Sequence, residues 1–113
     1  MKARDKKRLS TDEFFQAIRQ HEKNLTENEF TTKYLKTSRS YLCNRRNKHR
    51  DVSSDVLLNL YSELSGIGST WESMATTENN PSTRQRWQRN AETYTQLANQ
   101  VIGKILDRAR ADT

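Results

Sequence analysis

Cysteine, proline and membrane-length apolar runs are scarce or missing in this sequence, and each absence narrows the possible settings. The one cysteine, Cys43, cannot form an internal disulfide, which favours a reducing compartment. No stretch approaches the roughly 18 apolar residues of a membrane span. The basic start, residues 1–10, has no apolar stretch after it and so does not resemble a signal peptide. We therefore expect a cytoplasmic protein with no membrane partner.

Strand patterns and catalytic motifs are missing as well. No segment shows the period-two alternation of a half-buried strand, and no linker rich in glycine or proline divides the chain. There is no nucleophile elbow, glycine-rich phosphate loop or His-Glu metal motif. The spacing of His21, Cys43 and His49 does not suit a metal. The sequence predicts an all-α protein that is not an enzyme and needs no metal or cofactor.

Positive charge is abundant and uneven. The net charge is +6; residues 1–50 hold 14 Lys or Arg against 6 Asp or Glu, whereas residues 51–113 hold 6 against 8. A basic N-terminal half indicates an anionic partner that binds there, with nucleic acid favoured over membrane. Simple solubility remains an alternative explanation for this charge.

Helix caps and apolar spacing predict five to six helices. Capping-box patterns begin at Ser10 and Thr26, and Thr37 or Ser38 is available to cap a third helix. We expect Gly66 to end the fourth helix in a turn over residues 66–69, and Ser82 to cap a long last helix after Pro81. The first three predicted helices span about 11–24, 27–36 and 40–47. A fourth carries apolar residues from 56 to 64 and ends at 65–66, and the last two span about 69–78 and 83–111.

Residues 30–64, FTTKYLKTSRSYLCNRRNKHRDVSSDVLLNLYSEL, carry a resemblance to a known family. A short leading helix is followed by Ser38-Arg39-Ser40-Tyr41-Leu42, a basic loop, and a serine before an aliphatic helix. This segment resembles the helix-turn-helix domain of the phage Cro and repressor family. It departs from the family at Arg45, where an aliphatic residue is usual, at Arg46, where an acidic one is common, and at Lys48, where the chain commonly turns on glycine. The leading helix, with Thr31-Thr32-Lys33, also lacks the family's usual pattern of alanine and small residues.

The resemblance implies that double-stranded DNA is the partner and that the helix at about 38–47 enters the major groove. We expect Leu42 to anchor this helix, with Tyr41 or the stem of Arg45 assisting. The expected base contacts are Arg39, Ser40, Asn44 and Arg45. The expected backbone contacts are Thr37, Ser38, Lys48, His49 and Arg50. A basic arm, Lys2 to Arg8, could add phosphate or minor-groove contacts.

Apolar residues of the last helix recur with steps of 4, 3, 4, 3 and 4 from residue 87 to 105, a heptad rhythm. We predict a dimer seam there, with intramolecular core as the alternative. The expected seam residues are Trp87, Tyr94, Ala98, Val101 and Ile105. The predicted organisation is a flexible arm (1–9), a DNA-binding domain (10–68) and a helical dimerisation region (69–113).

The function favoured by the sequence is a homodimeric, sequence-specific transcriptional regulator that reads a palindromic operator. The main alternative is a protein-interaction module, such as an antirepressor or regulatory adaptor, whose helix-turn-helix fold does not read DNA. Binding of structured RNA through the same basic face is a third possibility, which the lack of an aromatic stacking platform disfavours. The cations at 45, 46, 48 and 50 could instead form a solvated face with no binding role. Cys43 is expected to be either a packing residue or a redox switch.

Overall fold

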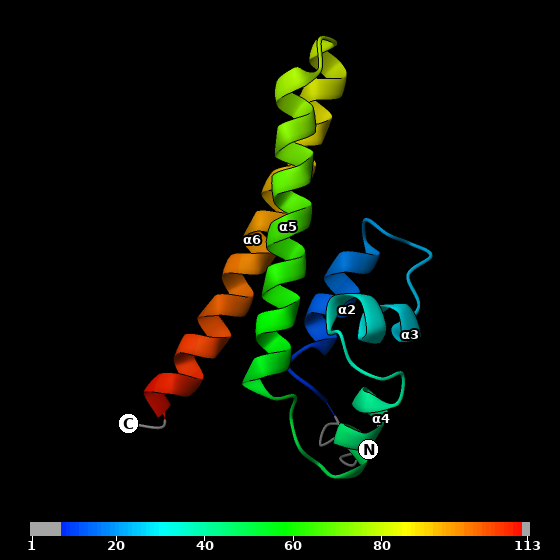
Figure 1. Cartoon of the computed structure of the whole chain (residues 1–113), viewed down its shortest axis with the longest axis vertical. Helices are drawn as coiled ribbons and strands as arrows, with labels where there is room; N and C mark the ends of the chain where they lie inside the picture. The colour runs from blue at the N-terminus through cyan, green and yellow to red at the C-terminus, as the bar shows by residue number, and fades with distance from the viewer. Residues whose placement is uncertain (1–7, 112–113) are drawn as a thin grey trace. The chain divides into compact units, whose positions relative to one another are not determined.

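The structure, a computed structural model, describes residues 8–111, and the regular secondary structure in this range is helical. The described residues contain no strand, which confirms the all-α prediction (Figure 1). Along the chain they form two compact units that divide between Asn59 and Leu60. The elements are α2 (Asp12–Arg19), α3 (Glu27–Glu29) with a π-helical turn η1 (Phe30–Tyr34), α4 (Tyr41–Asn47), α5 (Ser54–Thr77) and α6 (Pro81–Ala111).

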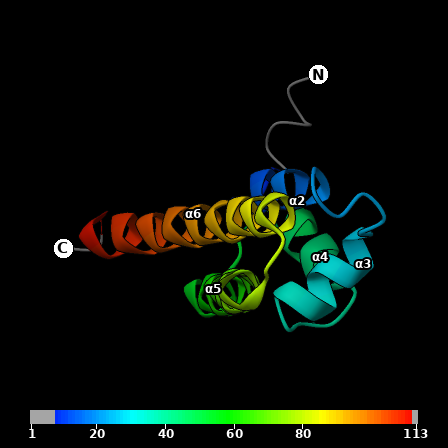
Figure 2. The same cartoon turned by 90° about the horizontal axis from the view of Figure 1, so that it is seen from above.

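The first unit groups α2, α3 and α4 with the first six residues of α5 (Figure 2). Its core is rich in aromatic side chains. Phe30 lies at its centre, with its ring centroid 5.1 Å from that of Phe15 and 5.7 Å from that of Tyr34. The phenol of Tyr34 donates a hydrogen bond to Glu22. The apolar side chains of this unit that are buried most completely are Phe14, Ile18, Phe30, Tyr34, Leu35, Leu42, Val52 and Leu57.

The segment predicted as a second α-helix contains a π-helical turn. The capping box at Thr26 forms as predicted: its hydroxyl accepts from Glu29 N, and Glu29 accepts from Thr26 N. From Phe30 the helix widens, and Leu35 N donates to the carbonyl of Phe30 five residues back. Phe30, Tyr34 and Leu35 are thereby all fully buried, so packing of large side chains accompanies the wider turn.

The start of the first helix differs from the prediction. The predicted helix of residues 11–24 is shorter, Asp12–Arg19, and its N-cap Thr11 makes no side-chain capping bond. The capping box at Ser10 is wrong: Asp12 accepts from the backbone N–H of Leu9, whereas the Ser10 hydroxyl donates to Asp51. The arm predicted over residues 1–9 lies mostly outside the described residues, and its last residue, Leu9, is buried.

The turn predicted at residues 66–69 is absent, because α5 is a single helix across both glycines. Neither glycine has a positive φ, so neither acts as a helix C-cap. Gly68 instead permits close packing: a Cβ there would lie 2.8 Å from Thr95 Oγ1 and 3.3 Å from the carbonyl oxygen of Ala91, both on α6. The domain boundary predicted at 68/69 consequently falls inside a helix.

We expect Gly68→Ala to lower the free energy of unfolding by about 1–3 kcal/mol, because the Ala91 carbonyl belongs to the backbone and cannot rotate away. The matched control is Gly103→Ala, since a Cβ there would meet no other side chain and no other helix within 4 Å in the part of the chain that the structure describes. That change should raise stability by about 1 kcal/mol through helix propensity. Urea unfolding followed by circular dichroism measures both; equal stability of the two variants would contradict the close packing at Gly68.

The helix α6 begins at Pro81, and Asn80 supplies its cap instead of Ser82. Asn80 Oδ1 accepts from the backbone N–H groups of Ser82 (3.0 Å) and Thr83 (3.2 Å). Pro81 occupies the first helical position, where its missing N–H costs nothing. In the second unit α5 and α6 therefore form an antiparallel hairpin, joined through residues 78–80 (Figure 1).

Candidate nucleic-acid interface

One side of α4 attaches this short helix to the first unit. Leu42 is its only buried side chain, with 2% of its surface exposed. Beside it the Tyr41 hydroxyl accepts from the backbone N–H of Ser53 at 3.1 Å. The guanidinium of Arg45 lies 5.5 Å from the centroid of the Tyr41 ring, and Arg45 Nε donates to the carbonyl of Asp51 at 2.9 Å. Leu42 thus has the anchoring role predicted for it, and Tyr41 and Arg45 assist.

Arg45 was predicted to contact bases, and the structure gives it an internal contact. The side chain is half-buried, and its bond to Asp51 closes the loop that follows α4. Arg45 can pack at a position where the resembled family has an aliphatic side chain. Its apolar stem and the flat face of its guanidinium can both contact neighbouring groups. This arrangement leaves Arg39, Ser40 and Asn44 as the predicted base-contacting residues that are exposed.

Arg46 is paired with acidic residues of two other helices. Its Nη2 lies 2.8 Å from Asp12 Oδ1 at the start of α2 and 3.3 Å from Glu27 Oε2 at the start of α3. Partial burial of the guanidinium opposes its charge, but the two carboxylates outweigh this effect and raise the pKa of Arg46 above its ordinary value. Arg46 therefore holds α4 to α2 and α3, a role that the sequence analysis did not assign.

Asp51 connects the loop after α4 to the start of the first helix. Its Oδ1 accepts from the backbone N–H and the hydroxyl of Ser10, at 2.9 and 3.0 Å, and from the backbone N–H of Val52 at 2.8 Å. Together with the Arg45 bond to the Asp51 carbonyl, these contacts fix the path of the basic loop 48–50. His49, one position after Lys48, adopts the left-handed backbone conformation in this loop, with a φ of 54°.

The opposite side of α4 is polar and open to solvent. Its exposed residues follow helical spacing and form a row with no charge of its own. Asn47 Nδ2 lies 3.8 Å from Cys43 Sγ, so Cys43 belongs to this row and not to the core. The row consists of Ser40, Cys43, Asn44 and Asn47. Cys43 and Asn47 were not among the predicted contacts, although their spacing from Ser40 and Asn44 marks the same face.

Cations flank this row at both ends. Residues 30–50 hold seven Lys or Arg and no Asp or Glu. Arg39 precedes α4, and Lys48, His49 and Arg50 follow it; all four are exposed. Among the described residues, no hydrogen bond or ion pair engages the side chains of Arg39, Lys48 or Arg50. These three charges are available for an anionic partner, in contrast to Arg46.

The predicted phosphate contact at Thr37 is already occupied within the chain. Its backbone N–H and its hydroxyl both donate to the carbonyl of Thr31, at 3.1 and 3.0 Å. Neither Thr37 nor Ser38 caps α4: the N-cap is Ser40, without a side-chain capping bond, and the hydroxyls of Ser38 and Ser40 lie 3.4 Å apart. Ser38 and Ser40 remain exposed, so these two hydroxyls can still reach a partner.

The residues predicted for a dimer seam on α6 lie largely in the interior of a single chain. Tyr94, Ala98 and Val101 are 4%, 2% and 0% exposed, whereas Trp87 and Ile105 are half-buried. The middle of the heptad stripe thus contributes to intramolecular core, the alternative that the sequence left open. A second chain would find only the ends of the stripe accessible.

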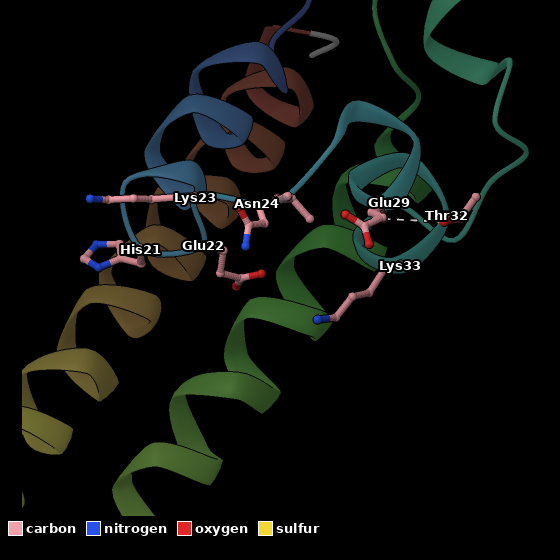
Figure 3. A pocket seen from close by; sticks show the side chains of 8 residues that line it. His21, Glu22, Lys23, Asn24, Glu29, Thr32 and Lys33 are labelled. Atoms are coloured by element: carbon pink, nitrogen blue, oxygen red, sulfur yellow. Dashed lines mark hydrogen bonds between the residues drawn. The ribbon is translucent and has the colours of Figure 1, made fainter.

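A polar pocket of about 560 Å³ lies between the turn after α2 and the segment α3–η1 (Figure 3). Its acidic groups already have roles, because Glu22 accepts from Tyr34 and Glu29 completes the capping box at Thr26. Over residues 8–111 no group of three or more His, Cys, Asp or Glu side chains is placed to hold a metal ion. None of the helices in this range is long and apolar enough to cross a membrane. The pocket adds no ligand-binding chemistry to the surface of α4.

Fold and surface define a small all-α protein that presents a short polar helix between basic flanks. The chain belongs to DUF6626, a family of unknown function, which it matches over residues 12–113. Comparisons with curated proteins and with solved structures gave no match. Any function must therefore be argued from the residues themselves.

Proposed function

We propose that this protein is a sequence-specific DNA-binding transcriptional regulator that acts as a homodimer. The observation that carries the proposal is the two-sided construction of α4. Leu42, Arg45 and Arg46 hold one side to the first unit, and the opposite side presents a polar row between unpaired cations. Proteins that read base edges with a helix need this combination of a fixed orientation and an exposed polar face.

The chemistry of the exposed residues suits the DNA major groove. Arg39 can donate two hydrogen bonds to guanine O6 and N7, and Asn44 can pair with adenine N6 and N7. Ser40 lies four residues before Asn44 on the same face and can bond to either base. Lys48 and Arg50 have the charge and exposure to contact phosphates beside the groove. Arg45 supports the helix in this proposal instead of reading a base.

A protein-interaction module is the second candidate, and specific observations favour it. The helix α4 has only seven residues, and the connection from η1 spans six residues, longer than the usual three to four of a helix-turn-helix. A remnant of the motif could present the same face to an acidic protein. Selection of bound duplexes from a random DNA pool separates the two candidates. A recovered palindrome supports the regulator. If no sequence is enriched, and any affinity for DNA does not depend on salt concentration, the protein-interaction module is the remaining candidate.

Lys48→Ala gives a separate prediction about phosphate contacts. We expect it to weaken binding to specific and random DNA alike and to reduce the slope of log K against log salt concentration by roughly 1. Lys23→Ala is the control, because Lys23 is an exposed lysine of the same unit outside the α4 surface. Fluorescence anisotropy at several salt concentrations measures the slopes. If both variants change the slope equally, Lys48 has no particular phosphate contact.

A further inference from the structure

The apolar residues of α5 continue beyond the part of the helix in which they are buried. They recur with steps of 4, 3, 4 and 3: Leu60, Leu64, Ile67, Trp71 and Met74. Leu60 and Leu64 are fully buried, Ile67 and Trp71 are half-buried, and Met74 is 39% exposed. Exposure thus rises along a single heptad stripe toward the end of the hairpin. Such a stripe is typical of a helix that packs against another helix.

A groove runs beside this stripe on the same face of α5. Small residues at a spacing of four, Ser62, Gly66 and Thr70, line it together with the apolar side chains at 67, 71 and 74 and the acidic Glu63. Apart from the neighbouring residues and the backbone of α5 itself, no heavy atom of the described residues lies within 4 Å of the position that a Cβ would take at Gly66. The face therefore has both projecting side chains and spaces between them. When two helices pack, the projecting side chains of one fit into the spaces of the other.

Both tryptophans of the chain lie at this place. The ring centroids of Trp71 on α5 and Trp87 on α6 are 6.0 Å apart, with a tilt of 53° between the planes. Both side chains remain half-buried after this contact. The exposed apolar surface consequently spans both helices of the hairpin. The interface between α5 and α6 does not bury all of it.

The charges of the hairpin suit a second copy. The helix α5 carries Asp55, Glu63 and Glu72 and no Lys or Arg. The first ten residues of α6, 81–90, carry Arg84, Arg86 and Arg89 and no Asp or Glu. A second hairpin of the same sequence therefore brings a basic helix to the acidic one, and the reverse at the symmetry-related contact.

We propose that two copies of the chain pair through Ile67, Trp71, Met74 and Trp87, so that two hairpins form a four-helix bundle. Four-helix bundles bury heptad stripes of this kind between antiparallel helices. The choice of a second copy as the occupant rests in part on the proposed function, which requires a dimer to read a palindrome. The seam lies mainly on α5, whereas the sequence predicted the stripe of α6, of which Tyr94, Ala98 and Val101 are already buried.

Sedimentation velocity of the full chain without DNA tests the seam. Over roughly 1–100 µM we expect wild type to pass from monomer to dimer, and Met74→Glu to raise the dimer Kd roughly 100-fold by placing a charge in the contact. The matched control is Leu106→Glu, because Leu106 is 52% exposed and lies outside the seam; its dimer Kd should equal that of wild type. Circular dichroism checks that each variant is folded.

Tryptophan emission provides a readout that needs no mutation. Dilution of wild type through its Kd should shift the emission to longer wavelength as Trp71 and Trp87 gain solvent. A monomer at all concentrations, a dimer dissociated by Leu106→Glu alone, or halving of the mass without a change in emission would each overturn the seam. These measurements contain no DNA, so they test the dimer contact alone. If the dimer forms but separate DNA-binding experiments fail, the proposed function is wrong and this contact still stands.

Discussion

Replacing Leu42 by alanine should lower the free energy of unfolding of the first unit by about 2–5 kcal/mol. The expected loss is large because Leu42 is 2% exposed and is the only buried side chain of α4. The remaining contacts of α4, the Arg46 ion pairs and the Tyr41 and Arg45 hydrogen bonds, are partly exposed and contribute less per group. Urea unfolding measures the change, and hydrogen exchange of the α4 amides shows whether this helix opens first.

Cys43→Ala is the control for Leu42→Ala, since Cys43 is the neighbouring residue on the exposed side of the same helix. Its effect should stay within about 0.5 kcal/mol. If Leu42→Ala has an equally small effect, then α4 is not anchored as the structure indicates. DNA binding should fall in Leu42→Ala as well, because a helix without its anchor loses the orientation that groove recognition requires.

The double substitution Arg39→Ala and Asn44→Ala should have the largest effect on operator binding. Each lost base contact costs about 1–3 kcal/mol, so the pair should weaken specific binding by about 2–6 kcal/mol. Stability should remain close to wild type, because both side chains are exposed. Anisotropy with the selected operator and with a scrambled duplex separates specific from non-specific binding, and only the specific component should collapse.

A matched double variant, Arg19→Ala with Asn99→Ala, removes the same two residue types from exposed positions outside α4. We expect its operator affinity to equal that of wild type. Should the Arg39 and Asn44 variant also bind normally, α4 is not the recognition helix, and the interaction-module hypothesis gains support.

Much of the helical order was predictable because it depends on short-range chemistry. The capping box at Thr26, the extent of α4, and the long uninterrupted α6 follow from residues within four positions of one another. Gly66 and Gly68 could not be interpreted in this way, because a glycine pair suits a turn and close helix packing equally. Only the approach of Ala91 and Thr95 to Gly68 decides between them.

The candidate site was predictable on one side of α4 only. Exposure of Ser40 and Asn44 follows from helical spacing around Leu42, and Arg39 lies in the polar segment just before the helix. The partners of Arg46, by contrast, lie 34 and 19 positions away, at the starts of two other helices. The sequence shows that positions 46 and 48 are cations, but it does not show which of them forms an ion pair. Only the folded structure distinguishes the paired Arg46 from Lys48.

The unbroken course of α5 limits how this protein can be shortened for experiments. A fragment cut at residue 68 would end inside the helix and leave its last four carbonyls without partners. It would also remove Ala91 and Thr95, the α6 residues nearest to Gly68. Cutting between Asn59 and Leu60, where the two units divide, would likewise split α5 after its first six residues. Either cut divides α5, so mutations in the full chain are the way to separate the functions of the two units without interrupting this helix.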